Sequence, residues 1–227
     1  MSLANVRQDG GFWFGSFDVG NARNLSLLID TGSQDVAVDP GLYIASSSSQ
    51  NLNTAGNLLY ATAQENGCGF ANISYNTYSD KVAFANLTST DQTLGAVIKK
   101  AQTDNGTITT LPHQGIVGFS GILANETQLG GKPFFQSLCD QGAIEDCRFG
   151  LALGTNGTGT QILGGIEGDL FEGTLVETPV NPNEWMFSGG IAVNGNISVT
   201  NQTIVADSGT ANVSLLPCDT RGYRWSC

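Results

Sequence analysis

The amino-acid sequence predicts a mostly β protein. Thirty of its 227 residues are glycine, and only 13% are charged. Short or alternating apolar runs bounded by Gly, Asn and Ser recur along the chain, a pattern typical of strands joined by turns. Helical periodicity is scarce. The best helix candidate lies at 133–138, a short turn is expected around Ala124, and 46–53 resembles a polar surface loop.

The first element that carries chemistry is an acidic turn at 30–33, which has the sequence Asp-Thr-Gly-Ser. Leu25–Ile29 leads into this turn and Val36–Val38 follows it. Apolar runs on both sides of a glycine turn predict two buried strands. Asp30 is therefore expected at the inner end of a strand.

A second acidic turn, Asp-Ser-Gly-Thr at 207–210, lies 177 residues further along the chain. Thr203–Ala206 leads into it and 213–216 follows as another apolar run. One such tetrapeptide is an ordinary turn, because Asp and Gly both favour turns. Two copies with matching apolar flanks favour two carboxylates that meet.

A pair formed by Asp30 and Asp207 would suit acid–base chemistry. Two buried carboxylates repel each other and share one proton over part of the acidic range. One group then acts as a base and the other as an acid, which can activate a water molecule and protonate a leaving amine. Gly32 and Gly209 allow close backbone approach. The hydroxyls that can fix the carboxylates belong to Thr31, Ser33, Ser208 and Thr210.

Charge and hydropathy exclude several classes of partner. The formal net charge is −11 and the sequence pI is about 4.2, which argues against nucleic acid or an anionic membrane surface. The acidity is also compatible with work at low pH. The chain has no stretch of about 18 apolar residues and does not open with a signal peptide.

The cysteines and sequons indicate the secretory route. Cys139 and Cys147 are close enough in sequence for a disulfide in an oxidising compartment. The single histidine, His113, is expected in a loop. Because the sequence has only this histidine and no CxxC pair, a zinc site is improbable. An extracellular or vacuolar protein is expected from nine sequons, at Asn24, Asn72, Asn86, Asn105, Asn125, Asn156, Asn196, Asn201 and Asn212.

The ordered motifs resemble the pepsin-like aspartic protease family over nearly the whole chain. The two acidic turns resemble its active-site loops, within 28–38 and 204–217. The remaining landmarks are similar to the family's opening strand, flap, packing loop, helix and inter-lobe strands, at 11–17, 73–75, 115–119, 134–138, 149–153 and 163–166.

This resemblance implies a bilobal β fold with an extended cleft, one aspartate from each lobe and a water held between them. It implies an N-terminal lobe over 1–173 and a partial C-terminal lobe over 174–227. The expected activity is that of an aspartic endopeptidase at acidic pH, with protein or peptide substrates, pepstatin-like inhibitors and no metal or cofactor. The full-length protein is expected to be a monomer.

The resemblance also assigns secondary site residues. Tyr75 and Thr77 correspond to the family's flap, and Ile116 to a subsite. The family's glycine-rich flap tip is replaced by 76–79, and its flap-bracing tryptophan falls at Ala37. Family character ends after Pro217, so the chain is expected to be a fragment with little or no proteolytic activity.

Three alternatives remain open beside this reading. The first is a non-catalytic relative that binds peptides or proteins in the same cleft. The second is a serine hydrolase using Ser120, which lacks the G-x-S-x-G spacing. The third is a phosphate loop at 154–160, which has no lysine and no following helix, so that a hairpin turn explains it better.

Overall fold

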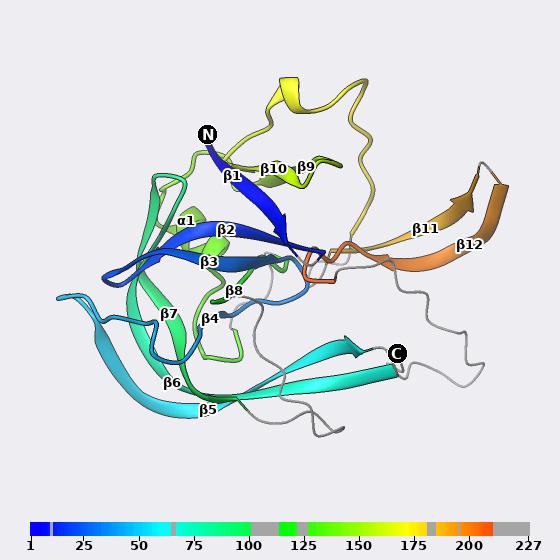
Figure 1. Ribbon diagram of the computed structural model, residues 1–227. Coiled ribbons are helices and arrows are strands. Elements are labelled where there is room, and N and C mark those ends of the chain that lie inside the picture. Colours follow the sequence, from blue (N-terminus) through cyan, green and yellow to red (C-terminus); the bar gives the residue numbers. More distant parts are fainter. Residues whose placement is uncertain are drawn as a thin grey trace.

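The computed structural model describes residues 1–9, 11–64, 67–100, 114–121, 127–180, 185–194 and 196–210. Strands dominate these ranges, as predicted (Figure 1). The strands are β1 (Ser2–Asp9), β2 (Phe12–Val19), β3 (Ala22–Asp30), β4 (Val36–Val38), β5 (Gln50–Gln64), β6 (Gly67–Phe84), β7 (Leu87–Lys100), β8 (Gly115–Gly118), β9 (Phe149–Leu153), β10 (Thr158–Leu163), β11 (Met186–Val193) and β12 (Asn196–Val205). The helices are α1 (Phe134–Asp140) and the short 3-10 helix η1 (Gly168–Leu170).

The first ten strands form one sheet in the order β5-β6-β7-β4-β8-β3-β2-β1-β10-β9. An additional pairing of Asp18 in β2 with Ala83 in β6 curls this sheet onto itself. The polar loop expected at 46–53 is wrong in its second half, because β5 begins at Gln50 and pairs with Ser79. β5 lies at the edge of the sheet, and most residues in its first half are exposed to solvent. This exposure explains its polar sequence.

Two hydrophobic clusters lie on opposite faces of the curled sheet. Strand alternation in β2 sends Phe17 into the larger cluster and Phe14 into the smaller one. In the larger cluster, the Phe17 and Phe84 rings stack with centroids 4.1 Å apart. The smaller cluster contains Leu28, Ala37, Leu58, Ile73, Tyr75, Val97, Ile116 and Leu129 beside Phe14.

The strands flanking the first acidic turn are separated by β8. Ile29 of β3 pairs with Val117 in parallel, and Val36 of β4 pairs with the same residue in the antiparallel sense. Gly118, at the end of β8, lies so close to the Gln34 backbone that a Cβ atom would approach it to 2.4 Å. Only glycine fits this crossing without displacement of the turn. The turn is therefore fixed from behind by β8.

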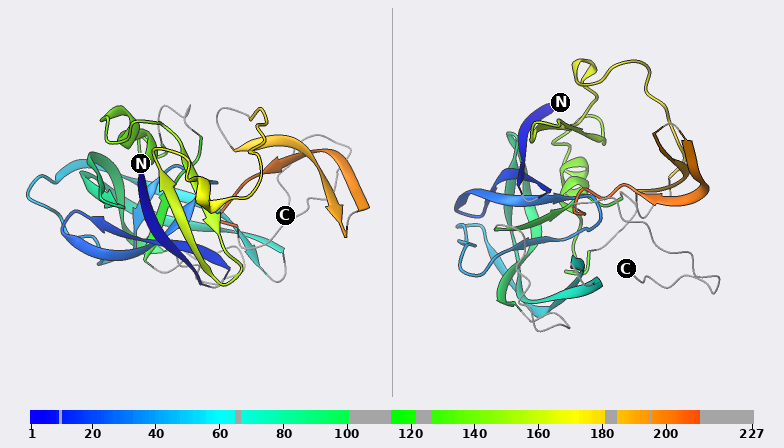
Figure 2. Two further views of the ribbon diagram at one scale, coloured as in Figure 1. Left: turned by 90° about the horizontal axis from the view of Figure 1, so that it is seen from above. Right: turned by 45° about the vertical axis from the view of Figure 1, so that its right-hand side comes forward.

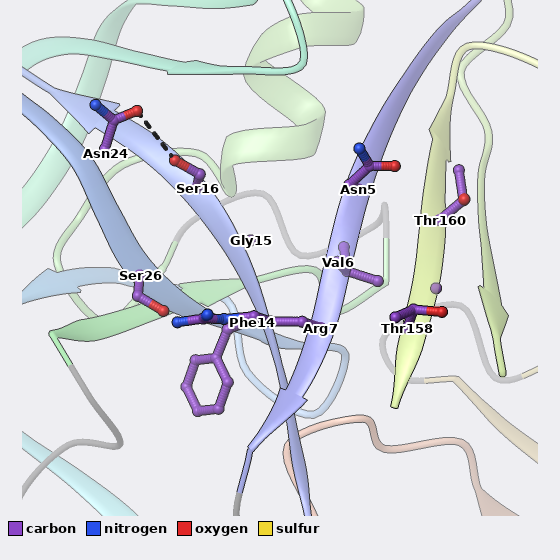
Figure 3. Close-up of a pocket in the computed structure, with 11 residues that line it drawn as sticks. Asn5, Val6, Arg7, Phe14, Gly15, Ser16, Asn24, Ser26, Thr158 and Thr160 are labelled. Atoms are coloured by element: carbon purple, nitrogen blue, oxygen red, sulfur yellow. Dashed lines mark hydrogen bonds between the residues drawn. The ribbon is translucent and has the colours of Figure 1, made fainter. Parts of the chain in front are cut away.

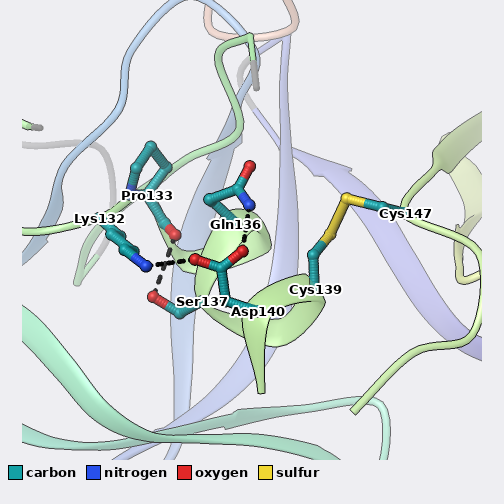
Figure 4. Close-up of a disulfide and its surroundings, with 7 residues drawn as sticks. All are labelled: Lys132, Pro133, Gln136, Ser137, Cys139, Asp140 and Cys147. Atoms are coloured by element: carbon teal, nitrogen blue, oxygen red, sulfur yellow. Dashed lines mark hydrogen bonds and ion pairs between the residues drawn. A yellow bond between two sulfur atoms is a disulfide. The ribbon is translucent and has the colours of Figure 1, made fainter. Parts of the chain in front are cut away.

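Helix α1 covers one side of the larger cluster with a buried face made by Phe134, Phe135 and Leu138. Its last turn is joined to the following segment by the disulfide between Cys139 and Cys147, whose Cα atoms are 5.4 Å apart (Figure 4). The helix confirms the prediction for 133–138, and the disulfide confirms the expected pairing.

The second acidic turn lies outside the large sheet. After β10 the chain passes through η1 and then through residues 171–180, which form neither strand nor helix. β11 and β12 then form a two-stranded hairpin that projects from the main body (Figures 1 and 2). The expected lobe boundary near residue 173 falls in this connection. Among the described residues, no helix has the length and apolar character needed to cross a bilayer.

Candidate active site

The first acidic loop, residues 30–33, sits at the end of a buried strand. Asp30 is 6% exposed, and its Oδ1 atom accepts a hydrogen bond from the Gly32 N–H at 2.9 Å. Behind the loop, the Phe119 N–H donates to the Asp30 carbonyl oxygen at 2.6 Å. The Asp30 backbone is thus anchored to the end of β8 while its carboxyl stays free to face the second loop.

The second acidic loop, residues 207–210, repeats this local construction. Asp207 Oδ1 accepts a hydrogen bond from the Gly209 N–H at 2.8 Å. Its Oδ2 atom accepts one from the Thr210 hydroxyl at 2.6 Å. Asp207 is half-buried, whereas Thr210 is exposed. Each aspartate is therefore oriented by the glycine two residues after it.

The hydroxyl residues of the two loops exchange hydrogen bonds in a two-fold pattern. The Ser208 N–H donates to Thr31 Oγ1 at 2.8 Å, and the Thr31 N–H donates to Ser208 Oγ at 3.1 Å. The Thr31 hydroxyl in turn donates to the Ala206 carbonyl oxygen at 2.8 Å. The Ser208 hydroxyl donates to the Ile29 carbonyl oxygen at 2.6 Å. Four bonds of matching type therefore join the loops.

Each glycine faces the carboxyl of the opposite loop. A Cβ atom on Gly32 would lie 2.6 Å from Asp207 Oδ1, and one on Gly209 would lie 2.1 Å from Asp30 Oδ1. Both distances are too short for any side chain. The structure therefore brings Asp30 and Asp207 together. Because each glycine has no side chain, the carboxyl of the opposite loop can occupy that space.

The electrostatics of the pair differ from those of an isolated acid. Burial first and the charge of Asp207 second raise the pKa of Asp30 to about 7. Ser33 takes the place that Thr210 has in the second loop. Its hydroxyl acts to lower the same pKa, yet its buried Oγ atom has no partner of good hydrogen-bond geometry in the described part of the chain. Asp30 can therefore hold a proton where an ordinary aspartate would be ionised.

The residues expected in the flap lie elsewhere. The β5–β6 hairpin closes between Gln64 and Gly67, so Tyr75 is well down the returning strand. Tyr75 is 6% exposed, and its hydroxyl lies over Gly56 of the neighbouring strand. Thr77 is 1% exposed in the same strand. Both side chains are therefore buried within the sheet, in the strand that returns from the tip of the hairpin.

Ile116 and Ala37 also belong to the smaller hydrophobic cluster. Ile116 is 3% exposed and pairs with Leu28 in the strand that leads to Asp30. Ala37 is completely buried, and its methyl group is part of the packing of this cluster. The structure thus places Ile116 in the packing behind the first loop and not on an open surface.

Tyr60, a tyrosine that was not expected in the site, interacts electrostatically with Asp30. Burial first, and then the charges of Asp35 and Asp30, raise the pKa of Tyr60. Its ring packs against the smaller cluster from β5. Its hydroxyl is buried and has no hydrogen-bond partner within the described ranges. The only sequence signal for it is the run Leu58-Leu59-Tyr60, an apolar pattern similar to that of 73–75.

A separate groove of about 680 Å³ lies between β1 and β10 on one side and β2 and β3 on the other (Figure 3). Its lining includes the polar residues Asn5, Arg7, Ser16, Asn24, Ser26 and Thr160. None of its lining residues belongs to the acidic loops, so size alone does not mark the site. His113, Ala124 and the apolar run 213–216 lie outside the described residues.

Comparison with known proteins identifies relatives along most of the chain. Residues 12–220 match the profile of the family described as eukaryotic aspartyl protease. An aspartic protease of Phaffia rhodozyma is 29% identical over 92% of this chain and 52% of its own length. Secreted aspartyl protease 1 of Malassezia globosa is 27% identical over 82% of this chain and 44% of its own. Pepsin A of Rhinolophus ferrumequinum is 27% identical over 89% of this chain and 54% of its own length.

The chain therefore spans about half the length of the curated relatives it matches. The family profile covers both acidic loops and the strands that position them. Together with the mostly β fold, this match shows that the chain belongs to the eukaryotic aspartyl protease family.

Proposed function

We propose that this chain carries the catalytic centre of an aspartic endopeptidase, in which Asp30 and Asp207 activate a water molecule for attack on a peptide bond. The observation that supports this most directly is the close approach of the two carboxyls, each facing the glycine of the opposite loop. The hydroxyl exchange between Thr31 and Ser208 holds the loops at that separation.

The proposed reaction uses the pair in its singly protonated form. The ionised carboxylate takes a proton from water as the water oxygen bonds to the peptide carbonyl carbon. The protonated carboxyl gives its proton to the carbonyl oxygen, which forms a neutral tetrahedral intermediate. The carbon–nitrogen bond then breaks as the nitrogen takes the proton that came from water, while the other carboxylate takes a proton from one hydroxyl of the intermediate, which restores the singly protonated pair. Because burial and Asp207 raise the pKa of Asp30, one proton is retained over the mildly acidic range.

Acidic working conditions follow from the same electrostatics. Above its raised pKa the Asp30 carboxyl is ionised and has no proton to give to the carbonyl oxygen. The disulfide between Cys139 and Cys147 and the exposed sequons Asn86 and Asn156 support an oxidising, extracellular or vacuolar compartment. Protein or peptide substrates, and pepstatin-like inhibitors, are proposed from the family.

Tyr60 is proposed as the tyrosine that contacts a bound peptide. Its unpartnered hydroxyl lies near Asp30, whereas the hydroxyl of Tyr75 lies over Gly56 in the neighbouring strand. A peptide backbone in the site would offer the acceptor that Tyr60 lacks. An extended peptide bound beside a β-hairpin is a common recognition mode.

The decisive experiment measures cleavage of an internally quenched peptide with apolar residues around the scissile bond, by the 227-residue chain, between pH 3 and pH 8. The sequence pattern after Pro217 predicts little or no activity, but because the two loops are joined by hydrogen bonds we expect cleavage at acidic pH. Activity should fall about 100- to 10,000-fold in Asp30→Asn and in Asp207→Asn, the range typical of acid–base groups. Asp146→Asn, which changes a surface carboxyl paired with Arg148, is the matched control and should retain activity.

Binding of the peptide is measured in parallel by fluorescence anisotropy. Cleavage that survives in Asp30→Asn would refute the assigned roles. Binding by the unaltered chain without turnover at any pH would support the non-catalytic relative instead.

A further inference from the structure

A tryptophan outside both acidic loops connects their backbones. The Trp185 Nε1–H donates to the Phe119 carbonyl oxygen at 2.7 Å. Phe119 is the same residue whose N–H donates to the Asp30 carbonyl oxygen at 2.6 Å. The indole of Trp185 is thus two hydrogen bonds away from the Asp30 backbone.

The backbone of Trp185 makes the corresponding connection to the second loop. Its carbonyl oxygen accepts a hydrogen bond from the Ala206 N–H at 2.9 Å. Ala206 directly precedes Asp207, and its own carbonyl oxygen accepts the Thr31 hydroxyl at 2.8 Å. The four bonds close a circuit that runs from the first loop to Phe119, Trp185, Ala206 and back to the first loop.

Aromatic packing holds the indole in this position. The ring of Trp185 meets that of Phe149 edge to face, with centroids 5.4 Å apart. Phe149 in turn packs against Phe119 with centroids 5.3 Å apart. The hydrogen-bonded circuit is therefore backed by rings from the large sheet, and Trp185 is its one side chain from beyond that sheet.

We propose that Trp185 is a positioning residue of the acidic pair, which holds the second loop against the first at the separation where the carboxyls face each other. The kinetic part of this inference rests on the proposed function. The structural part does not, because the circuit fixes the distance between the loops whether or not a peptide is cleaved.

Loosening the circuit has a defined electrostatic consequence. Asp207 faces Asp30 as a like charge, and Asp30 in turn acts on the pKa of Tyr60. If the second loop moves away, the repulsion that favours protonation of Asp30 weakens and the carboxyl becomes better solvated. Both changes lower the pKa of Asp30.

The test compares Trp185→Phe with Trp13→Phe. The first variant keeps an aromatic ring for Phe149 but removes the donor to Phe119. The second makes the same chemical change at a buried tryptophan of the larger cluster that takes no part in the circuit. Carboxyl ¹³C resonances of Asp30 and Asp207, assigned with the Asp→Asn variants, are followed by NMR from pH 3 to pH 8.

We expect the Asp30 midpoint to fall by about half a unit or more in Trp185→Phe, because a weaker like-charge interaction lowers a raised pKa. It should not move in Trp13→Phe. In the cleavage assay kcat should fall about tenfold with KM little changed, the pattern of an interaction needed only for the transition state. An Asp30 titration that is unchanged in Trp185→Phe overturns the inference.

A second variant keeps the test decisive if Trp185→Phe fails to fold. Replacement of Trp185 by benzothienylalanine, in which sulfur replaces the indole N–H, removes the donor while preserving ring size and shape. It should give the same fall in the Asp30 midpoint, and an unshifted midpoint counts against the inference. Absence of cleavage by the unaltered chain would refute the proposed function alone, since the titration requires no turnover.

Discussion

The two acidic loops have the same local construction but lie in regions of very different packing. The loop of Asp30 is enclosed by β3, β4 and β8 of the large sheet, and Asp30 and Thr31 are buried. The loop of Asp207 follows a two-stranded hairpin, and both Ala206 and Thr210 are exposed. In both loops the glycine two residues on donates to the carboxylate. The tetrapeptide thus orients the carboxyl in both loops, whereas the surrounding sheet decides how deeply the carboxyl is buried.

The largest expected difference concerns the two glycines. Gly209→Ala places a Cβ atom 2.1 Å from buried Asp30, and Gly32→Ala places one 2.6 Å from Asp207. We expect kcat/KM to fall by about 100-fold in both, a typical cost of displacing a reacting group by about 1 Å. Gly209→Ala should be the more severe, because Asp30 has less room to move. Peptide cleavage measures both, and Gly168→Ala, which has open space around it, is the control.

If the two glycine variants were equally active, or Gly32→Ala were the worse of the two, the contrast between a rigid first loop and a more yielding second loop would be wrong.

Removal of the Ser208 hydroxyl should destabilise the protein more than removal of the Thr31 hydroxyl. Ser208→Ala leaves the Ile29 carbonyl and the Thr31 N–H without partners inside the first region, where both residues are buried. We expect this change to reduce the free energy of unfolding by about 1–3 kcal/mol, the cost of unpaired buried groups. Thr31→Val frees the Ala206 carbonyl and the Ser208 N–H. It should cost about 1 kcal/mol or less, because Ala206 is exposed and Ser208 is only half-buried, so that water can replace both bonds.

Urea unfolding of the two single variants and the double variant measures this difference. The double variant should cost less than the sum, since both hydroxyls belong to the same set of bonds that joins the two loops. Strict additivity would show that the loops are not coupled.

A smaller effect is expected at the two tyrosines of the hairpin. Tyr60→Phe removes the unpartnered hydroxyl near Asp30 and should lower kcat/KM about tenfold, the value of one hydrogen bond. Tyr75→Phe changes only the hydroxyl over Gly56 and should leave turnover nearly unchanged. Steady-state cleavage kinetics separate the two. The opposite ranking would restore Tyr75 as the residue that contacts substrate.

The smallest effect is a pH dependence of stability with opposite signs at two acids. Burial and Asp207 raise the pKa of Asp30 to about 7, so its folded form binds a proton more tightly than the unfolded chain. The stability that Asp30 contributes to the folded state is fully present below about pH 4 and is lost as the pH rises towards 7. Burial also raises the pKa of Asp35, which acts in the same direction.

Asp80 shows the reverse. Burial acts to raise its pKa, but hydrogen bonds from Ser46 and Tyr43 outweigh it and hold the pKa below its usual range. Its contribution is lost as pH falls below about 4. The melting temperature should therefore fall by a few degrees between pH 4.5 and pH 7.5. This is the typical response of a chain of this size to a loss of about 1 kcal/mol in the free energy of unfolding. Asp30→Asn should flatten this fall, and Asp80→Asn should change only the acidic side.

The strands that carry the acids could be predicted because their signal is local. Runs such as Leu25–Ile29 and Val36–Val38 are apolar and flank a glycine turn, so both strands and the inward acid follow from the sequence. The helix at 134–140 likewise begins after Pro133 and buries consecutive aromatic residues. These features depend on neighbours within about ten residues, as helix and turn signals generally do.

The rest depends on contacts between distant parts of the chain. Ile73-Ser74-Tyr75 and Leu58-Leu59-Tyr60 have similar patterns, and only the pairing of Gln64 with Gly67 decides which tyrosine is nearer the hairpin end. The mostly polar start of β5 was misread as loop, because an edge strand need not bury its side chains. No pattern around Trp185 indicated its bond to Phe119, which exists only once both segments are folded.

The hydroxyl exchange between the loops also sets an order of events during folding. Its bonds join residues 175 to 179 positions apart in the chain. Pairings this distant form slowly, after local structure has already closed shorter loops. The anchoring of Asp30 to β8, by contrast, needs only the large sheet. A chain in which only the large sheet has folded would therefore hold one oriented carboxyl without its counterpart.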